Sequence, residues 1–499
     1  MMAQFLRISA LALAALALLT LAACDSPVGP TSDPTPEAPA AVAAPVARTP
    51  TNPPSPTLSP SAATSTPPPS PTIPPSPTLP SSADASTPSP SPTGQPAATL
   101  PGPCGELCNY EFWQEGDVGV QDVRAELERG ADVNARHSSG DTPLLWAVYL
   151  DAAPEIIRLL LDHGADPAAK DAEGTPILTY ALVNGRSSEV IRWLLESGAD
   201  ANARNGDTPV LYEAVWFAAH ATHPEMVRLG SEDGRDLPKE SVEIIQSLLE
   251  HGADASAKDD FGQTVLFVYF GTIIEAESHN PDLRVVELLL EHGAEVELEL
   301  EDYPAVTVMD FALWAGAGTG IVALLLDHGS DAAARGDEGD TLLHAAALFA
   351  ADPQGFQLLL DNGADVAARG VFGRTALHLA ARVGELDPQA IRVLLDNGAD
   401  VAARDEDGAT PLHEAATHSG PEVVRLLLER GADASARDDR METPLHNAMT
   451  DEYGEYIADL EKVQLLLAYG ADVSAVNDDG RTACDLARQD DEAMRALLC

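Results

Sequence analysis

The sequence predicts an all-α repeat solenoid of about ten stacked units, preceded by a disordered stalk, in a chain of 499 residues. Two observations carry this prediction. From Gly130 onward, a glycine-containing pattern returns about every 33 residues, which is typical of stacked repeats. Before it, residues 25–103 hold 25 of the chain's 39 prolines and show no apolar periodicity, so this stretch cannot form a core.

The first element is an apolar leader. Residues 1–7 carry Arg7, and residues 8–23, ISALALAALALLTLAA, are all apolar or small apart from one serine and one threonine. This order is the layout of a secretory signal. The run is shorter than the about 20 apolar residues that span a bilayer. An uncleaved anchor helix and a plain cleaved signal remain the alternatives to the interpretation that follows.

The leader ends in LAAC, Leu21 to Cys24, which resembles a bacterial lipobox. The resemblance implies that the Cys24 thiol carries diacylglycerol and that residues 1–23 are removed. Acyl chains anchor a protein because each buried methylene contributes about 0.8 kcal/mol. We therefore expect a membrane-anchored lipoprotein of the bacterial cell envelope, facing the periplasm or the cell exterior.

Residues 24–103 are predicted to form a stalk between the lipid-anchor cysteine and the repeats. Proline fixes its own backbone and biases the residue before it toward extended forms, so the segment should be a semi-stiff tether. A Pro-rich ligand for a recognition domain is the alternative interpretation of the same composition.

Residues 104–499 are predicted to be the folded domain. Ten glycines mark the repeat starts, and in seven repeats a threonine follows 12 residues later. The glycines are Gly130, Gly164, Gly198, Gly252, Gly293, Gly329, Gly363, Gly398, Gly431 and Gly470; the threonines are Thr142, Thr264, Thr341, Thr375, Thr410, Thr443 and Thr482.

Each residue of the pattern has a physical role, seen well in the eighth repeat. Thr410 can cap a helix start, and Pro411 fits the first helical position, where its missing N–H costs nothing. Gly431 can end the second helix in a left-handed conformation. A period near 33 with TPLH and LLLxxGAD segments resembles the ankyrin repeat. The resemblance implies helix–turn–helix units with β-hairpin fingers, which stack and bind another protein without catalysis.

Repeats three to five depart most from the pattern, and we expect a partner to bind there. About 20 extra residues separate Gly198 from Gly252, and the fifth repeat has a two-residue extension. Thr175 and Thr208 come one and two residues early in repeats two and three, so the helices after them are expected to shift.

Aromatic residues gather in these middle repeats. The candidates for partner contact are Trp216, Phe217, Tyr269, Phe270 and Trp314, because aromatic side chains anchor interfaces. The alternative is that most of them belong to the core. Trp216 and Phe217 are adjacent and cannot face the same neighbour, so at least one is a surface candidate.

The charge balance excludes some partner classes. Asp and Glu number 79 against 29 Lys and Arg, which gives a formal net charge of −50. Nucleic acid is excluded because phosphate binding needs clustered cations. A basic protein partner is favoured, although solubility alone could explain the charge. The acidic finger at Asp405–Gly408 is no calcium loop, since Ala403 fills the first ligand slot.

No residue pattern indicates a cofactor, a small-molecule substrate or a catalytic nucleophile. His220 and His223, with Glu225 nearby, have a two-ligand spacing, but two ligands do not make a zinc site. Two alternatives to a binding module stay open. One is a metal or enzymatic site in repeats three to five, and the other is a structural surface element without a specific partner.

The remaining cysteines suit an oxidising compartment. Cys484 and Cys499 lie at ends of the last repeat's two helices that should meet, and Cys104 and Cys108 could pair beside the first helix. Both pairs are candidate disulfides. The alternative is four buried thiols, since Cys484 occupies a position that is usually Leu in the repeat.

Overall fold

The computed structural model describes residues 105–499, apart from 115–117, 222, 224–235, 277–280, 298–305, 337, 350–351, 385 and 452–454. The predicted signal, the predicted stalk, Cys24 and Cys104 lie outside the described residues. None of the described helices is both long and apolar enough to cross a membrane.

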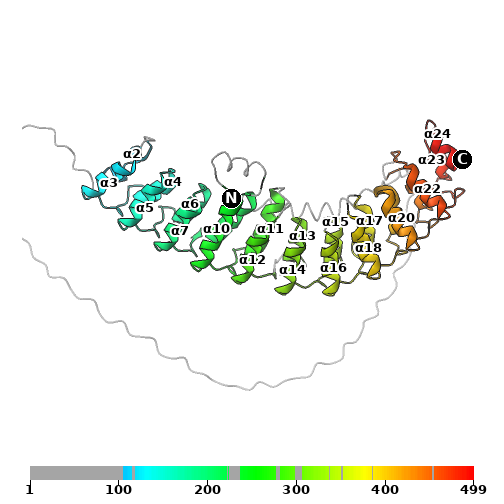
Figure 1. Cartoon of the computed structure of the whole chain (residues 1–499), viewed down its shortest axis with the longest axis horizontal. Coiled ribbons are helices and arrows are strands. Elements are labelled where there is room, and N and C mark those ends of the chain that lie inside the picture. Colours follow the sequence, from blue (N-terminus) through cyan, green and yellow to red (C-terminus); the bar gives the residue numbers. More distant parts are fainter. Residues whose placement is uncertain are drawn as a thin grey trace, which may run out of the picture. The chain divides into compact units, whose positions relative to one another are not determined.

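Helix pairs follow one another along a single row, as predicted (Figure 1). The first helices of the ten repeats are α4 (Pro143–Tyr149), α6 (Ile177–Val183), α8 (Val210–Ala221), α11 (Val265–Glu275), α13 (Val308–Trp314), α15 (Leu342–Leu348), α17 (Ala376–Arg382), α19 (Pro411–His418), α21 (Pro444–Asn447) and α23 (Ala483–Leu486). In Figure 1, α13 and α15 lie along the concave edge of the row.

The second helices form the opposite layer of the row. They are α5 (Pro154–Asp162), α7 (Ser188–Glu196), α10 (Leu237–Glu250), α12 (Leu283–Glu291), α14 (Thr319–Asp327), α16 (Pro353–Asp361), α18 (Pro388–Asp396), α20 (Pro421–Glu429), α22 (Leu460–Ala468) and α24 (Glu492–Leu498). Before the first repeat come η1 (Gly105–Cys108), α2 (Tyr110–Gln114) and α3 (Val120–Glu128), and a short η2 (Val371–Gly373) lies in the seventh finger.

The repeat pattern fixes where helices begin and end. All seven predicted threonines are N-cap residues, and all ten repeat glycines have a positive φ. At Gly431 φ is 93°, and the next N–H, that of Ala432, donates to the carbonyl of Leu427 over 3.0 Å. This six-residue closure satisfies a helix-end carbonyl and requires the left-handed conformation that favours glycine.

A single cluster of buried apolar residues runs from Leu107 in η1 to Leu498 in α24. No repeat can bury its own apolar face, so each one completes the core of its neighbour. The stack is therefore continuous through the irregular middle repeats.

The fingers are mostly turns rather than paired strands. In the described residues one two-stranded ladder is present, β1 (Arg204–Asn205) with β2 (Thr208–Pro209). The eighth finger shows the usual form, in which the Asp405 N–H donates to the Ala409 carbonyl over 3.0 Å. The Asp405 carboxylate accepts from the N–H groups of Asp407 and Ala409, which is the turn role of Asp.

The expected helix shifts are only partly correct. The first helix of repeat two begins at Ile177 with Pro176 as its N-cap, which is the usual offset from the repeat glycine, so the early Thr175 moves nothing. In repeat three, Thr208 lies in β2 and α8 begins one residue early. In repeat five, Thr307 caps α13 two residues late, as the extension predicts.

Candidate functional site

Four of the five aromatic candidates are buried, so their assignment as exposed partner contacts is wrong. Tyr269 and Phe270 are 0% exposed, Trp314 is 7% exposed and Phe217 is 8% exposed. Trp216 differs, with 42% of its surface exposed. The adjacent pair Trp216 and Phe217 thus divides between surface and core.

Tyr269 is buried because it replaces a small residue of the pattern. It is the fifth residue of its helix, where α8, α13 and α19 have Ala214, Ala312 and Ala415. Its hydroxyl oxygen accepts from the N–H of Asp282, the N-cap of α12, over 2.8 Å. The ring therefore ties the two helices of repeat four together.

Trp314 packs in a row of rings that links repeats five and six. Its ring centroid lies 4.9 Å from that of Phe311 and 6.0 Å from that of Phe349. Phe349 is 36% exposed, so only the end of this row reaches the surface.

A different set of apolar side chains is exposed on the first helices of repeats one to three. Tyr149 is 53% exposed, Val183 62% and Trp216 42%. Each is the seventh residue of its helix, α4, α6 or α8. We call these three residues the inner-helix stripe. Tyr149 and Val183 were not among the candidates predicted from the sequence, although their equal place in successive repeats is a signal that indicates them.

Further rings support the stripe. Tyr180 on α6 contacts Tyr149 edge-on, with ring centroids 5.4 Å apart. His220, one turn after Trp216, places its ring centroid 4.0 Å from the indole. The Nδ1 atom of His220 lies 2.9 Å from the Trp216 carbonyl oxygen. These contacts hold two of the three stripe side chains in place.

Carboxylates of the neighbouring fingers adjoin the stripe. The Tyr180 hydroxyl donates to Asp171 of the second finger over 2.5 Å, and burial raises the pKa of Tyr180 to about 12. Burial opposes ionisation of Asp171, but hydrogen bonds from Tyr180 and Thr175 outweigh it and lower the pKa of this carboxyl. Asp171 is therefore a fixed negative charge beside the stripe.

A buried acid lies one turn before Trp216. Glu213 is 7% exposed, and its Oε1 accepts from Asn205 of the third finger over 3.1 Å. Its Oε2 and the Thr179 hydroxyl have no hydrogen-bond partner among the described residues. Burial raises the pKa of the Glu213 carboxyl, because the charged form loses its hydration there.

The Arg186 side chain, which reaches the end of α4, is committed to the fold. Arg186 is 5% exposed and donates to the carbonyls of Ala147 and Val148, at the end of α4, over 2.8 and 3.0 Å. It also pairs with Asp151, whose side chain is 85% exposed. The guanidinium satisfies helix-end carbonyls and leaves the acidic partner at the surface.

The face of the first helices that carries the stripe in repeats one to three is polar in repeats seven and eight. Arg382 is the seventh residue of α17 and lies 3.3 Å from Glu414. Arg374 reaches both Glu414 and Asp405 over 3.4 Å. Burial raises the pKa of Asp405, although Arg374 opposes the shift. The exposed apolar stripe does not continue through these two repeats.

Four buried histidines connect neighbouring repeats. His344, His378, His413 and His446 each accept the N–H of the capping threonine at Nδ1. Their Nε2 atoms lie 3.1–3.3 Å from a carbonyl oxygen of the next finger. Burial lowers the pKa of His378 and His413 to about 4, so both are neutral links.

The candidate metal ligands do not assemble into a site in the described part of the chain. His220 is directed at Trp216 as given above, and Glu225 lies outside the described residues. No group of three His, Cys, Asp or Glu side chains suited to a metal is found among residues whose placement is described.

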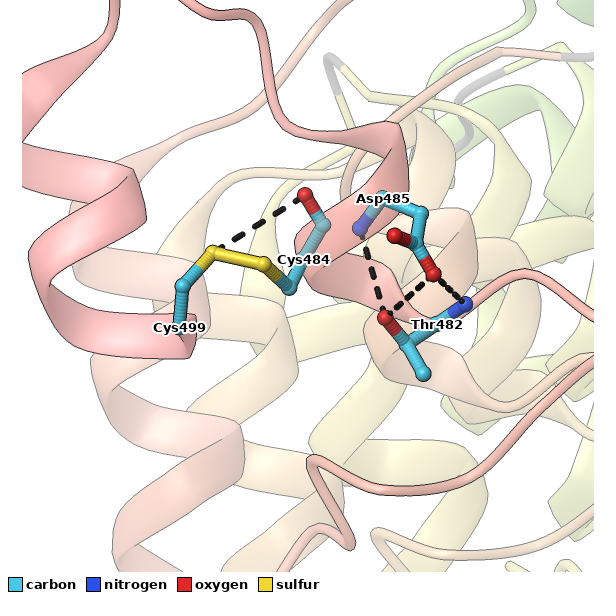
Figure 2. Close-up of a disulfide and its surroundings, with 4 residues drawn as sticks. All are labelled: Thr482, Cys484, Asp485 and Cys499. Carbon is cyan, nitrogen blue, oxygen red and sulfur yellow. Dashed lines mark hydrogen bonds between the residues drawn. A yellow bond between two sulfur atoms is a disulfide. The ribbon is translucent and has the colours of Figure 1, made fainter.

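A disulfide joins Cys484, in the first turn of α23, to Cys499 after α24 (Figure 2). The two Cα atoms are 5.4 Å apart. Beside the bridge, Thr482 and Asp485 cap the start of α23, with the Thr482 N–H donating to the carboxylate over 2.9 Å. Cys108 lies in η1, and its predicted partner Cys104 is outside the described residues.

These helix pairs, capping threonines and glycine-ended second helices define a solenoid of stacked helix–turn–helix repeats. The family model for ankyrin repeats (three copies) matches residues 119–205 and 343–438. These two stretches of the chain are therefore ankyrin repeats. The two matched ranges leave residues 206–342 between them, which is the stretch where the sequence departs from the pattern.

A curated relative is similar to part of the chain. E3 ubiquitin-protein ligase KEG of Arabidopsis thaliana is 35% identical over 114 residues, which is 23% of this chain and 6% of that protein. Because the chain spans so little of that relative, the likeness says nothing about the activity of this chain.

Proposed function

We propose that this chain is a non-catalytic ankyrin-repeat scaffold, lipid-anchored in the bacterial cell envelope, which binds a basic protein through the inner-helix stripe. The exposed stripe is the observation that carries the binding surface. Three large apolar side chains at equal positions on consecutive helices form a patch that has no role in the core. Patches of this kind mark interaction sites on soluble domains.

The charge of the chain supports a basic partner. The formal net charge is −50, and Asp151, Asp171 and Glu173 all lie in repeats one and two, near the stripe. Such a field speeds the encounter with a cationic protein and weakens as salt is added. Binding should therefore lose affinity as ionic strength rises.

The leader supports the anchor and the location. Cys24 follows an apolar segment in the LAAC arrangement, and a Pro-rich stretch of suitable length separates it from the first repeat. Expression of the full chain in a bacterium tests this. The mature protein should begin at a diacylated Cys24 by mass spectrometry, and Cys24→Ala should release it from the membrane. An unmodified, uncleaved chain in the membrane would contradict the anchor.

Capture with the full chain tests the binding surface. Bait carrying Tyr149→Ala and Trp216→Ala is compared with wild type in extracts of envelope proteins, with cross-linking and mass spectrometry. Tyr469→Ala is the matched control, since Tyr469 is 47% exposed but lies in repeat nine. We expect one dominant basic prey that the stripe variant loses and the control keeps.

Two outcomes would count against this proposal. Prey that the stripe variant retains would place the binding surface elsewhere on the stack. A bait that captures nothing above background would favour a structural surface element.

A further inference from the structure

We propose that the inner-helix stripe binds an extended polyproline II segment of the basic partner, with an apolar side chain at every third position. This inference rests on the proposed function, because it names the kind of segment that the stripe takes. Three features carry it, namely the spacing of the stripe, its free donors and the charge beside it.

The spacing of the stripe follows from helix packing. Tyr149, Val183 and Trp216 occupy the same place on α4, α6 and α8, which pack side by side in that order. Axes of packed helices lie about 8–10 Å apart. A partner that touches all three side chains therefore needs apolar groups on one side at about that interval.

A polyproline II segment meets this interval. It has three residues per turn and rises about 3.1 Å per residue, so every third side chain returns to one side after about 9.3 Å. A β-strand presents the same side every second residue, after about 6.6–6.8 Å, and loses register across three repeats. An α-helix presents one side after each turn of about 5.4 Å, and only every second turn would meet a stripe position.

The stripe also offers donors that suit such a backbone. A polyproline II segment has no internal hydrogen bonds, so its carbonyls need external donors. Within the part of the chain that the structure describes, neither the Tyr149 hydroxyl nor the Trp216 indole N–H makes a hydrogen bond, and both side chains are exposed. Aromatic rings with a polar tip are the usual lining of grooves that hold Pro-rich segments.

The acidic residues beside the stripe determine which residue type the segment should carry on the side that faces them. The second finger adjoins the stripe through the bond of Tyr180 to Asp171, and the third finger adjoins it through the bond of Asn205 to Glu213. Glu173 and Asp207 are exposed on these two fingers. When apolar residues face the stripe, another side of the three-fold segment faces these acids. Lys or Arg at that position completes the match.

Synthetic peptides test the inference with the full chain as receptor. The probe is a 12-residue peptide of four Leu-Pro-Lys units, read by fluorescence anisotropy at low salt. One control replaces Lys by Glu, a second permutes the same residues so that the leucines are adjacent, and a third is a basic amphipathic helix. We expect the probe to bind at least about tenfold more tightly than each control, since tenfold corresponds to loss of one good contact.

Variants connect that binding to the stripe. Tyr149→Ala with Trp216→Ala should weaken the probe at least about tenfold, while Tyr469→Ala should leave it unchanged. Equal binding of the permuted or Glu peptide would overturn the three-residue spacing or the charge assignment, respectively. Tighter binding of the helix would overturn the polyproline II form.

The two proposals fail in distinguishable ways. If no peptide binds while the stripe still captures a protein, the segment inference falls and the scaffold stands. If the stripe variant also retains all captured protein, the surface itself is wrong.

Discussion

Repeats six to nine and repeats three to five build the same helix pairs with different side chains. The third residue of each first helix shows this. It is His344, His378, His413 and His446 in repeats six to nine. It is Tyr212, Phe267 and Asp310 in repeats three to five. The regular repeats are linked by a polar bridge, whereas the middle ones rely on buried rings or on a carboxyl.

One middle repeat keeps the bridge by another route. The Tyr212 hydroxyl lies 2.6 Å from the Gln263 carbonyl oxygen. Gln263 immediately precedes the capping Thr264, and the histidines contact carbonyls at the same place in their next repeats. The link between repeats is thus a requirement of the fold, and more than one residue type meets it.

The largest expected effect comes from the aromatic core of repeat four. Phe270→Ala should lower the free energy of unfolding by about 3–5 kcal/mol, because this side chain is fully buried and its removal leaves a cavity. Denaturant unfolding of the full chain measures it. Trp216→Ala, on the exposed stripe, is the control and should change stability by no more than about 0.5 kcal/mol. A Phe270→Ala chain that stays fully stable but binds no partner would return Phe270 to the surface candidates.

The contrast between the regular repeats and the aromatic core of repeat four shows how much of the structure could be predicted from the sequence. Thr410, Gly431 and the other repeated residues gave the helix ends residue by residue, because caps and left-handed turns depend on local geometry. Tyr269 and Phe270 were misassigned because nine of the eleven residues of α11 are buried. A helix that is apolar all round has no periodicity to say which side faces solvent.

The next largest loss of stability is expected when the disulfide is removed. This bridge lies in repeat ten, directly after the regular repeats. Replacing Cys484 and Cys499 by Ser should cost about 3 kcal/mol in the chain-entropy account of a 15-residue loop. The loss should be confined to repeats nine and ten, seen as faster hydrogen exchange there. A non-reduced digest should contain a linked peptide of Cys484 and Cys499. Two free thiols at these positions would contradict the bridge.

Acid should destabilise repeat seven, in the regular region, and stabilise repeat five, in the middle region. Burial lowers the pKa of His378 and His413 to about 4, below the unfolded value near 6.5. Stability from these groups is present above about pH 6.5 and falls as pH drops toward 4, since the unfolded chain then binds more protons. Burial raises the pKa of Asp310 to about 6, so repeat five gains stability over the same fall in pH.

Hydrogen exchange across that pH range measures both signs in one experiment. Each pKa unit corresponds to about 1.4 kcal/mol, so the change is at most about 3 kcal/mol per group. Protection, corrected for the intrinsic exchange rate, should decrease in repeat seven and increase in repeat five between pH 6.5 and 4.5. In repeat eight the raised pKa of Asp405 opposes the effect of His413. Asp310→Asn serves as the control, because it removes the gain in repeat five and leaves the histidine repeats unchanged. A uniform change along the stack would contradict the regional assignment.

The smallest effect tests whether tyrosine and histidine are equivalent links between repeats. Tyr212→Phe keeps the buried ring and removes only the hydroxyl, so the carbonyls of Gln263 and Ala257, 2.6 and 2.8 Å away, lose this contact. A net hydrogen bond is worth about 0.5–1.5 kcal/mol, and unfolding should reflect a loss of that size. Tyr149→Phe is the matched control, because that hydroxyl is on the exposed stripe, and it should leave stability unchanged. Equal stability of the two variants would mean that ring burial alone links repeats three and four, and that the polar bridge belongs to the regular repeats.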